Sequence, residues 1–191
     1  FSLIWKAFVP ENARMIGQTR LVASPTDPDR RRIADLTDTE QLMVWGFRTW
    51  AFVHHASRSV ERDLRKGCGR EEGDRVTVAV RSVLVLIALY GRRPLRLAPP
   101  GWPAVTTDEI RLLQLFSAGQ RGTAEGVQAH LTWLLRPGHG SHPEIAVAHA
   151  ATILARFGFT LPWRYERAEP IGVPATVPRE PAYAGRLRVC D

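Results

Sequence analysis

The sequence predicts an all-α fold: a single domain of about five helices around a central apolar helix at residues 76–90, followed by a proline-rich irregular tail. Three observations support this prediction. The run 76–90, VTVAVRSVLVLIALY, is the most apolar stretch of the chain. Elsewhere, Ser/Thr-x-x-Glu motifs precede apolar residues that recur every three or four positions, as in amphipathic helices. Residues 162–181 contain five prolines, a composition typical of an extended segment.

The run 76–90 has features of both a strand and a helix. Three valines alternate with other residues at its start, and β-branched residues favour strands. Its length decides for a helix, because 15 residues pass without a turn former. Asp74 is placed to cap the start, and Gly91 followed by Pro94 is a typical helix end.

Arg81 is the one charged residue within this run. It divides the apolar stretch, which is then too short for a membrane span of about 20 residues. A buried and unpaired guanidinium would be costly. We therefore expect Arg81 either to reach solvent along a strip formed by Thr77 and Ala88 or to pair with a carboxylate such as Glu40 or Glu109.

A long first helix is predicted from Thr37 to about Gly67, because Thr37 and Glu40 form a capping box. Its apolar stripe consists of Met43, Phe47, Trp50, Ala51 and His54. Residues that recur every seven positions mark its exposed side: Gln41, Arg48, His55 and Arg62. Cys68 to Gly73 would then connect this helix to the apolar one.

Residues 92–105 contain four prolines and are predicted to cross the surface without helix, with Trp102 against the core. Three shorter helices follow. The first starts at a capping box of Thr106 and Glu109, and the third at one of Ser141 and Glu144. The second is marked by the apolar spacing of Val127, Leu131, Leu134 and Leu135.

These elements divide the chain into a flexible N-terminal extension (1–36), a helical domain (37–160) and a proline-rich tail (161–191). The two cysteines, Cys68 and Cys190, are too few for a disulfide framework, and no secretory signal is evident. We therefore expect a cytoplasmic protein. The sequence leaves open whether it forms a homo-oligomer.

The chain carries a formal charge of +7, which favours anionic partners. Arginine dominates the basic residues, and this bias also arises from GC-rich coding sequence. Residues 30–100 hold 14 basic and 8 acidic side chains, a net charge of +6, whereas residues 101–160 hold 4 of each. The charge excess therefore predicts a basic face formed by Arg58, Arg62, Arg65, Lys66, Arg92, Arg93 and Arg96.

Our leading interpretation is a non-enzymatic interaction or regulatory protein whose anionic partner meets this basic face or binds the tail. A protein partner is favoured over nucleic acid. The alternative is a nucleic-acid-binding regulator. Residues 106–135 begin in a way similar to the output helix-turn-helix of response regulators. Their second helix, however, offers Gln128 and His130 and no cation before Arg136, whereas a recognition helix normally carries basic residues.

A metal-binding protein or enzyme is the third interpretation. His139, His142 and His149 are weak candidate metal ligands, because their spacing does not form the paired motifs of structural zinc sites. The phosphate-binding loops Gly-x-x-x-x-Gly-Lys-Ser/Thr and Gly-x-Gly-x-x-Gly do not occur, so we expect no cofactor. Asp108 and Glu109 lie at a predicted helix start, where the helix dipole accounts for acidic residues.

Overall fold

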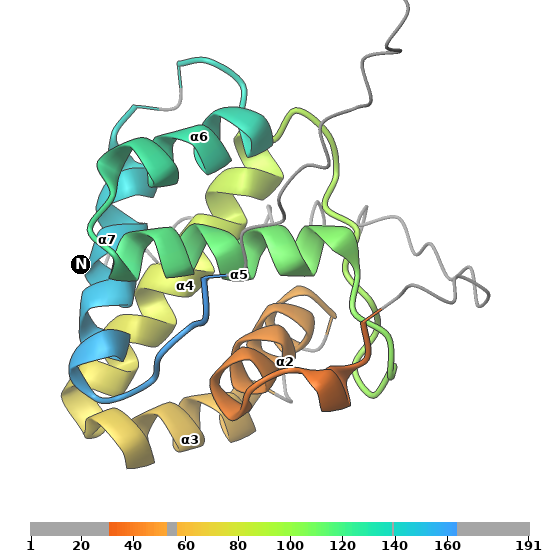
Figure 1. Cartoon of the computed structure of the whole chain (residues 1–191), viewed down its shortest axis with the longest axis vertical. Coiled ribbons are helices and arrows are strands. Elements are labelled where there is room, and N and C mark those ends of the chain that lie inside the picture. The colour runs from red at the N-terminus through yellow and green to blue at the C-terminus, as the bar shows by residue number, and fades with distance from the viewer. Residues whose placement is uncertain (1–30, 53–56, 139, 164–191) are drawn as a thin grey trace, which may run out of the picture.

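The computed structural model describes residues 31–52, 57–138 and 140–163, and in these ranges it is helical without strands (Figure 1). Its elements are a short 3-10 helix η1 (Ile33–Asp35) and the α-helices α2 (Asp38–Phe52), α3 (Ser57–Cys68), α4 (Arg70–Tyr90), α5 (Thr107–Gln120), α6 (Ala124–Leu134) and α7 (His142–Arg156). This confirms the predicted all-α fold. The proline-rich residues 164–191 lie outside the described ranges, as do residues 1–30.

The helices surround one apolar core. α4 packs along α3 on one side and α7 on another, and α7 also packs against α5. α5 in turn contacts α2 and α6, so α4 and α5 together organise the interior (Figure 1). Val76, Val80 and Val83 of α4 and Leu112 and Phe116 of α5 are fully buried. Burial of these large apolar side chains is the main source of stability.

The prediction of one long helix from Thr37 to Gly67 is wrong, because the structure has two helices, α2 and α3, in that stretch. The indole nitrogen of Trp45 donates a hydrogen bond of 3.3 Å to Ser59 Oγ. A continuous helix would hold residues 14 positions apart about 21 Å from each other. α3 is therefore folded back toward α2.

The predicted connection from Cys68 to Gly73 is also shorter than expected. Gly69 alone joins α3 to α4, at a φ of 82° that a residue with a side chain rarely adopts. Gly73 lies in α4 instead, where a Cβ would be 2.7 Å from the backbone nitrogen of Arg65. Glycine at this position permits the close packing of α3 on α4. Asp74 consequently does not cap the helix but pairs with Arg65 at 2.5 Å.

Two of the three capping boxes are confirmed. In the first, the backbone N–H of Thr37 donates to Glu40 and that of Glu40 donates to Thr37 Oγ1. Thr106 and Glu109 make the same reciprocal pair at the start of α5. The box at Ser141 is not formed, because the Ser141 side chain makes no capping hydrogen bond.

Arg81 has a carboxylate partner, as the sequence predicts, in Glu61 of α3. Its Nη1 lies 3.6 Å from Glu61 Oε1 of α3, and its side chain is 30% exposed. Thr77, expected on the exposed strip, is buried and donates a hydrogen bond to the Gly73 carbonyl. Val78 is exposed in its place. The reason is that α3 packs against α4 on the side where the sequence placed solvent.

Segments on both sides of the predicted domain belong to the folded unit. Ile33 N–H donates to the Pro103 carbonyl and Val105 N–H to the Arg31 carbonyl, and Leu36 is buried. At the other end, Leu161 is buried and exchanges hydrogen bonds with Ser117 and Gln120 of α5. The folded unit therefore begins before residue 37 and continues past residue 160.

Candidate functional site

The predicted basic residues fall into two groups at opposite ends of the molecule. Arg58, Arg62, Arg65 and Lys66 are exposed on α3, and Arg92, Arg93 and Arg96 follow the far end of α4 (Figure 1). The α3 group is interleaved with carboxylates. Arg65 pairs with Asp74, and Arg62 lies 3.9 Å from Asp63. The positive charge of α3 is therefore partly neutralised.

The second group is brought together by α6. The chain after α4 runs antiparallel to the chain after α6: Arg92 N–H donates to the Leu134 carbonyl and Arg136 N–H donates to the Tyr90 carbonyl. The Nε of Arg92 also donates to the Thr132 and Leu135 carbonyls. A cation at this position is stabilised by the negative end of the α6 dipole. Arg92 and Arg136 thereby lie on two adjoining segments of the chain.

Asp108 anchors the next part of this group. Its carboxylate is 2% exposed and receives two hydrogen bonds from Arg93, of 2.6 and 2.7 Å. It also accepts the Arg96 backbone N–H at 2.8 Å and lies 3.4 Å from Arg111 Nη1. Burial alone would raise the pKa of Asp108, but hydrogen bonds from Arg93 and Arg96 and the charges of Arg93 and Arg111 lower it below its ordinary value.

Trp133, on α6, adds an exposed aromatic ring to these arginines. Trp133 is 47% exposed, the guanidinium of Arg111 lies over its ring at 3.6 Å from the centroid, and that of Arg93 lies at 5.1 Å. Such cation–π contacts favour these positions for the guanidinium groups. Tyr90 is a second exposed aromatic residue at this end of the molecule.

We call this region the Trp133 surface. It consists of Tyr90, Arg92, Arg93, Arg96, Asp108, Arg111, Trp133 and Arg136. Its five arginines come from three parts of the chain. Within the described ranges, Asp108 is the carboxylate that forms ion pairs with two of them, Arg93 and Arg111. The Trp133 surface is therefore strongly positive, and it combines fork-shaped hydrogen-bond donors with two exposed aromatic rings.

His130 lies one turn before Trp133 on α6 and is half-buried. Burial, together with the charge of Arg111, lowers its pKa. His142 and His149 are exposed on α7, and His139 lies outside the described residues. Within the described part of the chain, no three His, Cys, Asp or Glu side chains are grouped so that they could hold a metal ion. Burial, with a smaller effect of Glu72, raises the pKa of Cys68, which disfavours its reactive thiolate form.

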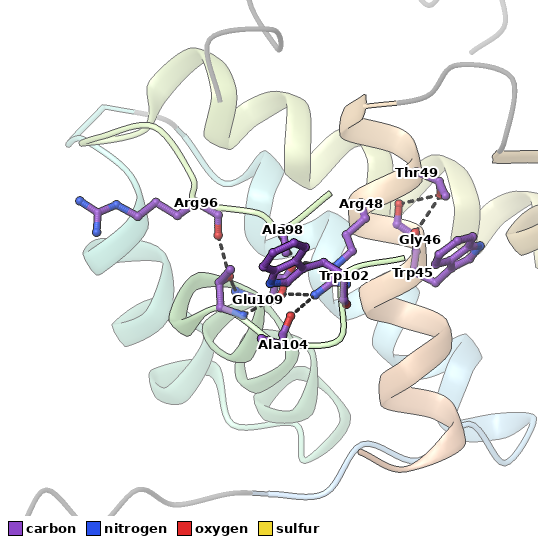
Figure 2. A network of polar contacts seen from close by, with 10 residues as sticks. Trp45, Gly46, Arg48, Thr49, Arg96, Ala98, Trp102, Ala104 and Glu109 are labelled. Carbon is purple, nitrogen blue, oxygen red and sulfur yellow. Dashed lines mark hydrogen bonds and ion pairs between the residues drawn. The ribbon is translucent and has the colours of Figure 1, made fainter. Parts of the chain in front are cut away.

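A second polar network lies beside the Trp133 surface but in the interior (Figure 2). Arg48 of α2 is 1% exposed and binds Glu109 of α5 through Nε and Nη2, at 2.8 and 2.9 Å. Its remaining donors reach the carbonyls of Trp102 and Ala104. The prediction that Arg48 lies on an exposed side is thus wrong. Figure 2 also shows the Arg96 side chain directed away from this network.

The basic-face prediction included three residues of the Trp133 surface and missed the other five: Tyr90, Asp108, Arg111, Trp133 and Arg136. The sequence holds one weak signal for Arg111, which is the one charged residue in IRLLQLF and must therefore face outward or be paired. Asp108 pairs with Arg93 because of the path that residues 92–105 take, and no periodic sequence pattern predicts that path.

None of the helices in the described ranges has the length and hydropathy that a membrane span requires. Comparisons with protein-family models, with curated proteins and with solved structures found no match to this chain.

Proposed function

We propose that this chain is a non-enzymatic interaction domain that binds an acidic segment of a partner protein through the Trp133 surface. The observation that carries the proposal is a surface with five arginines and two exposed aromatic residues, on which Arg93 and Arg111 both pair with the buried Asp108 carboxylate. An excess of positive charge in one place attracts an anionic partner and accelerates its association.

The residue types favour a protein partner. Trp, Tyr and Arg are the residues that most often dominate the binding energy of protein interfaces. The position of Arg111 adds to this argument. A nucleobase needs an open ring face for stacking, and at Trp133 a guanidinium already lies 3.6 Å over the ring. A carboxylate needs only the free N–H groups of the arginines.

Nucleic-acid binding is the second candidate. A capped helix, a short turn and a second helix follow one another as α5, residues 121–123 and α6, and the arginines of the Trp133 surface flank α6. The exposed side of α6 carries Gln128, Thr132 and Trp133. Because α6 itself carries no Lys or Arg, phosphate contacts would have to come from the flanking arginines.

Titrations of the folded protein with poly-glutamate, single-stranded DNA and duplex DNA test the proposal. We expect poly-glutamate to bind, and Arg93→Gln combined with Arg96→Gln to weaken binding by roughly tenfold or more. The matched control is Arg58→Gln combined with Lys66→Gln on α3, which we expect to change affinity little.

Two results would contradict the proposal. Absence of poly-glutamate binding at low salt would remove it. Tighter binding of DNA, with an affinity that falls steeply as salt rises, would favour the second candidate, because release of counterions from phosphates produces that dependence.

A further inference from the structure

Among the arginines that contact the acidic residues of α5, Arg111 differs in how its donors are used. The fork of Arg48 is closed on Glu109, and the fork of Arg93 is closed on Asp108 with two bonds of 2.6 and 2.7 Å. Arg111 makes one long contact of 3.4 Å to Asp108. The forked N–H donors of an arginine can form two parallel hydrogen bonds to one carboxylate. Arg111 forms no such pair of bonds, and in this sense its fork is open.

Stacking on Trp133 orients this open fork. The Arg111 guanidinium lies 3.6 Å above the ring centroid, and its side chain is 33% exposed. The N–H groups of a guanidinium lie in its own plane, so a contact through its face leaves them available at the edge. Trp133 and Asp108 together restrict the rotamers of Arg111, which reduces the entropy lost when a ligand binds.

We infer that Arg111 is the residue of the Trp133 surface that reads an individual carboxylate of the partner, through a bidentate pair formed against the Trp133 ring. This inference rests on the proposed function and names the contact by which the Trp133 surface recognises a carboxylate. A carboxylate presents two oxygens in one plane, which matches the open fork. The chain already contains two such pairs, at Arg48 and Arg93, and the partner's carboxylate would form a third.

The substitution Arg111→Lys tests the bidentate contact, because lysine keeps the charge but lacks the fork. We expect Arg111→Lys to weaken binding of a peptide of alternating Glu and Ala by roughly tenfold, close to the loss caused by Arg111→Gln. Arg121→Lys is the matched control. Arg121 lies 5.3 Å over the ring of Trp163, outside the Trp133 surface, so the same change there should leave peptide affinity unaltered.

The outcomes separate the inference from the proposed function. If Arg111→Lys binds the peptide as the unmodified protein does while Arg93→Gln with Arg96→Gln binds it weakly, the surface acts only through its charge and the inference is wrong. If the unmodified protein does not bind the peptide, both fail. Circular dichroism and urea unfolding of each variant verify that a loss of affinity does not arise from unfolding.

Discussion

Asp108 and Glu109 are neighbours in the first turn of α5, and each pairs with an arginine from a distant part of the chain. The surroundings of the two pairs differ. Arg48 and Glu109 are 1% and 0% exposed, and Glu109 also accepts the backbone N–H groups of Ala98 and Thr106. In the other pair the carboxylate is buried but the Arg93 side chain is 40% exposed.

This difference separates a structural ion pair from one that a ligand can reach. Around Glu109, polar groups of α2, α5 and residues 98–106 satisfy one another, so the network fixes the path of that connection. Around Asp108, the guanidinium groups of Arg93 and Arg111 share one carboxylate, which also accepts the Arg96 backbone N–H, so their positive charge is only partly compensated. The interior pair contributes to the fold, and the surface pair arranges the Trp133 surface.

The largest effect is expected from removing one partner of the interior ion pair between Arg48 and Glu109. Arg48→Met leaves Glu109 buried and without its counter-ion, which should lower the free energy of unfolding by about 3–5 kcal/mol. Arg48→Met combined with Glu109→Leu removes both charges and should cost less than Arg48→Met alone. Urea unfolding at pH 7 measures both variants.

If Arg48→Met were only slightly destabilising, Glu109 would reach water, and the two ion pairs would not differ in the way proposed. Arg93→Met serves as the matched variant of the surface pair. Since Arg93 is 40% exposed and Asp108 keeps a second arginine nearby, we expect a smaller loss than at Arg48.

A smaller effect, with a defined pH dependence, is expected at Asp108. Asp108→Asn keeps the shape but removes the charge that binds Arg93, so stability at pH 7 should fall by about 1–2 kcal/mol. The pKa of Asp108 is lowered in the folded protein, so its ionised form stabilises the fold above the ordinary value of 3.8.

As the pH falls below 3.8 toward the lowered pKa, this contribution is lost in the unmodified protein. Asp108→Asn has no such contribution to lose. The difference in unfolding free energy between the two proteins should therefore shrink as the pH falls through 3.8 and below it. A difference that stays constant over this range would show that Asp108 acts through packing instead of charge.

The sequence was sufficient to predict the helical class and the starts of α2 and α5, because capping boxes and apolar spacing are local signals. The break after Phe52 was missed because the heptad of polar residues continues smoothly into α3. The same regularity placed Arg48 on the exposed side. Its burial depends on Glu109, 61 residues away, and no local pattern records a partner at that distance.

The candidate site was predictable only in part. A run of arginines after the apolar helix is visible in the sequence, so Arg92, Arg93 and Arg96 were included. Arg111 and Trp133 belong to separate helices and meet only because α6 folds back on α5. Net charge per segment predicts a single basic face that includes the α3 residues, because it ignores the length of α4, which separates the two groups (Figure 1).

The smallest expected effect concerns His130 and shows whether Asp108 truly leaves Arg111 uncompensated. Burial and then Arg111 lower the pKa of His130, so the unfolded chain takes up the proton at a higher pH than the folded one. Stability should therefore decline by a few tenths of a kcal/mol as the pH falls through the ordinary value of 6.5, and His130→Gln should abolish that decline.

NMR titration of His130 in Arg111→Gln gives the sharper measurement. Its pKa should rise only part of the way, because burial is the larger cause. An unchanged pKa of His130 would mean that Asp108 neutralises Arg111 as it does Arg93. The Arg48–Glu109 and Arg93–Asp108 ion pairs would then differ in exposure alone.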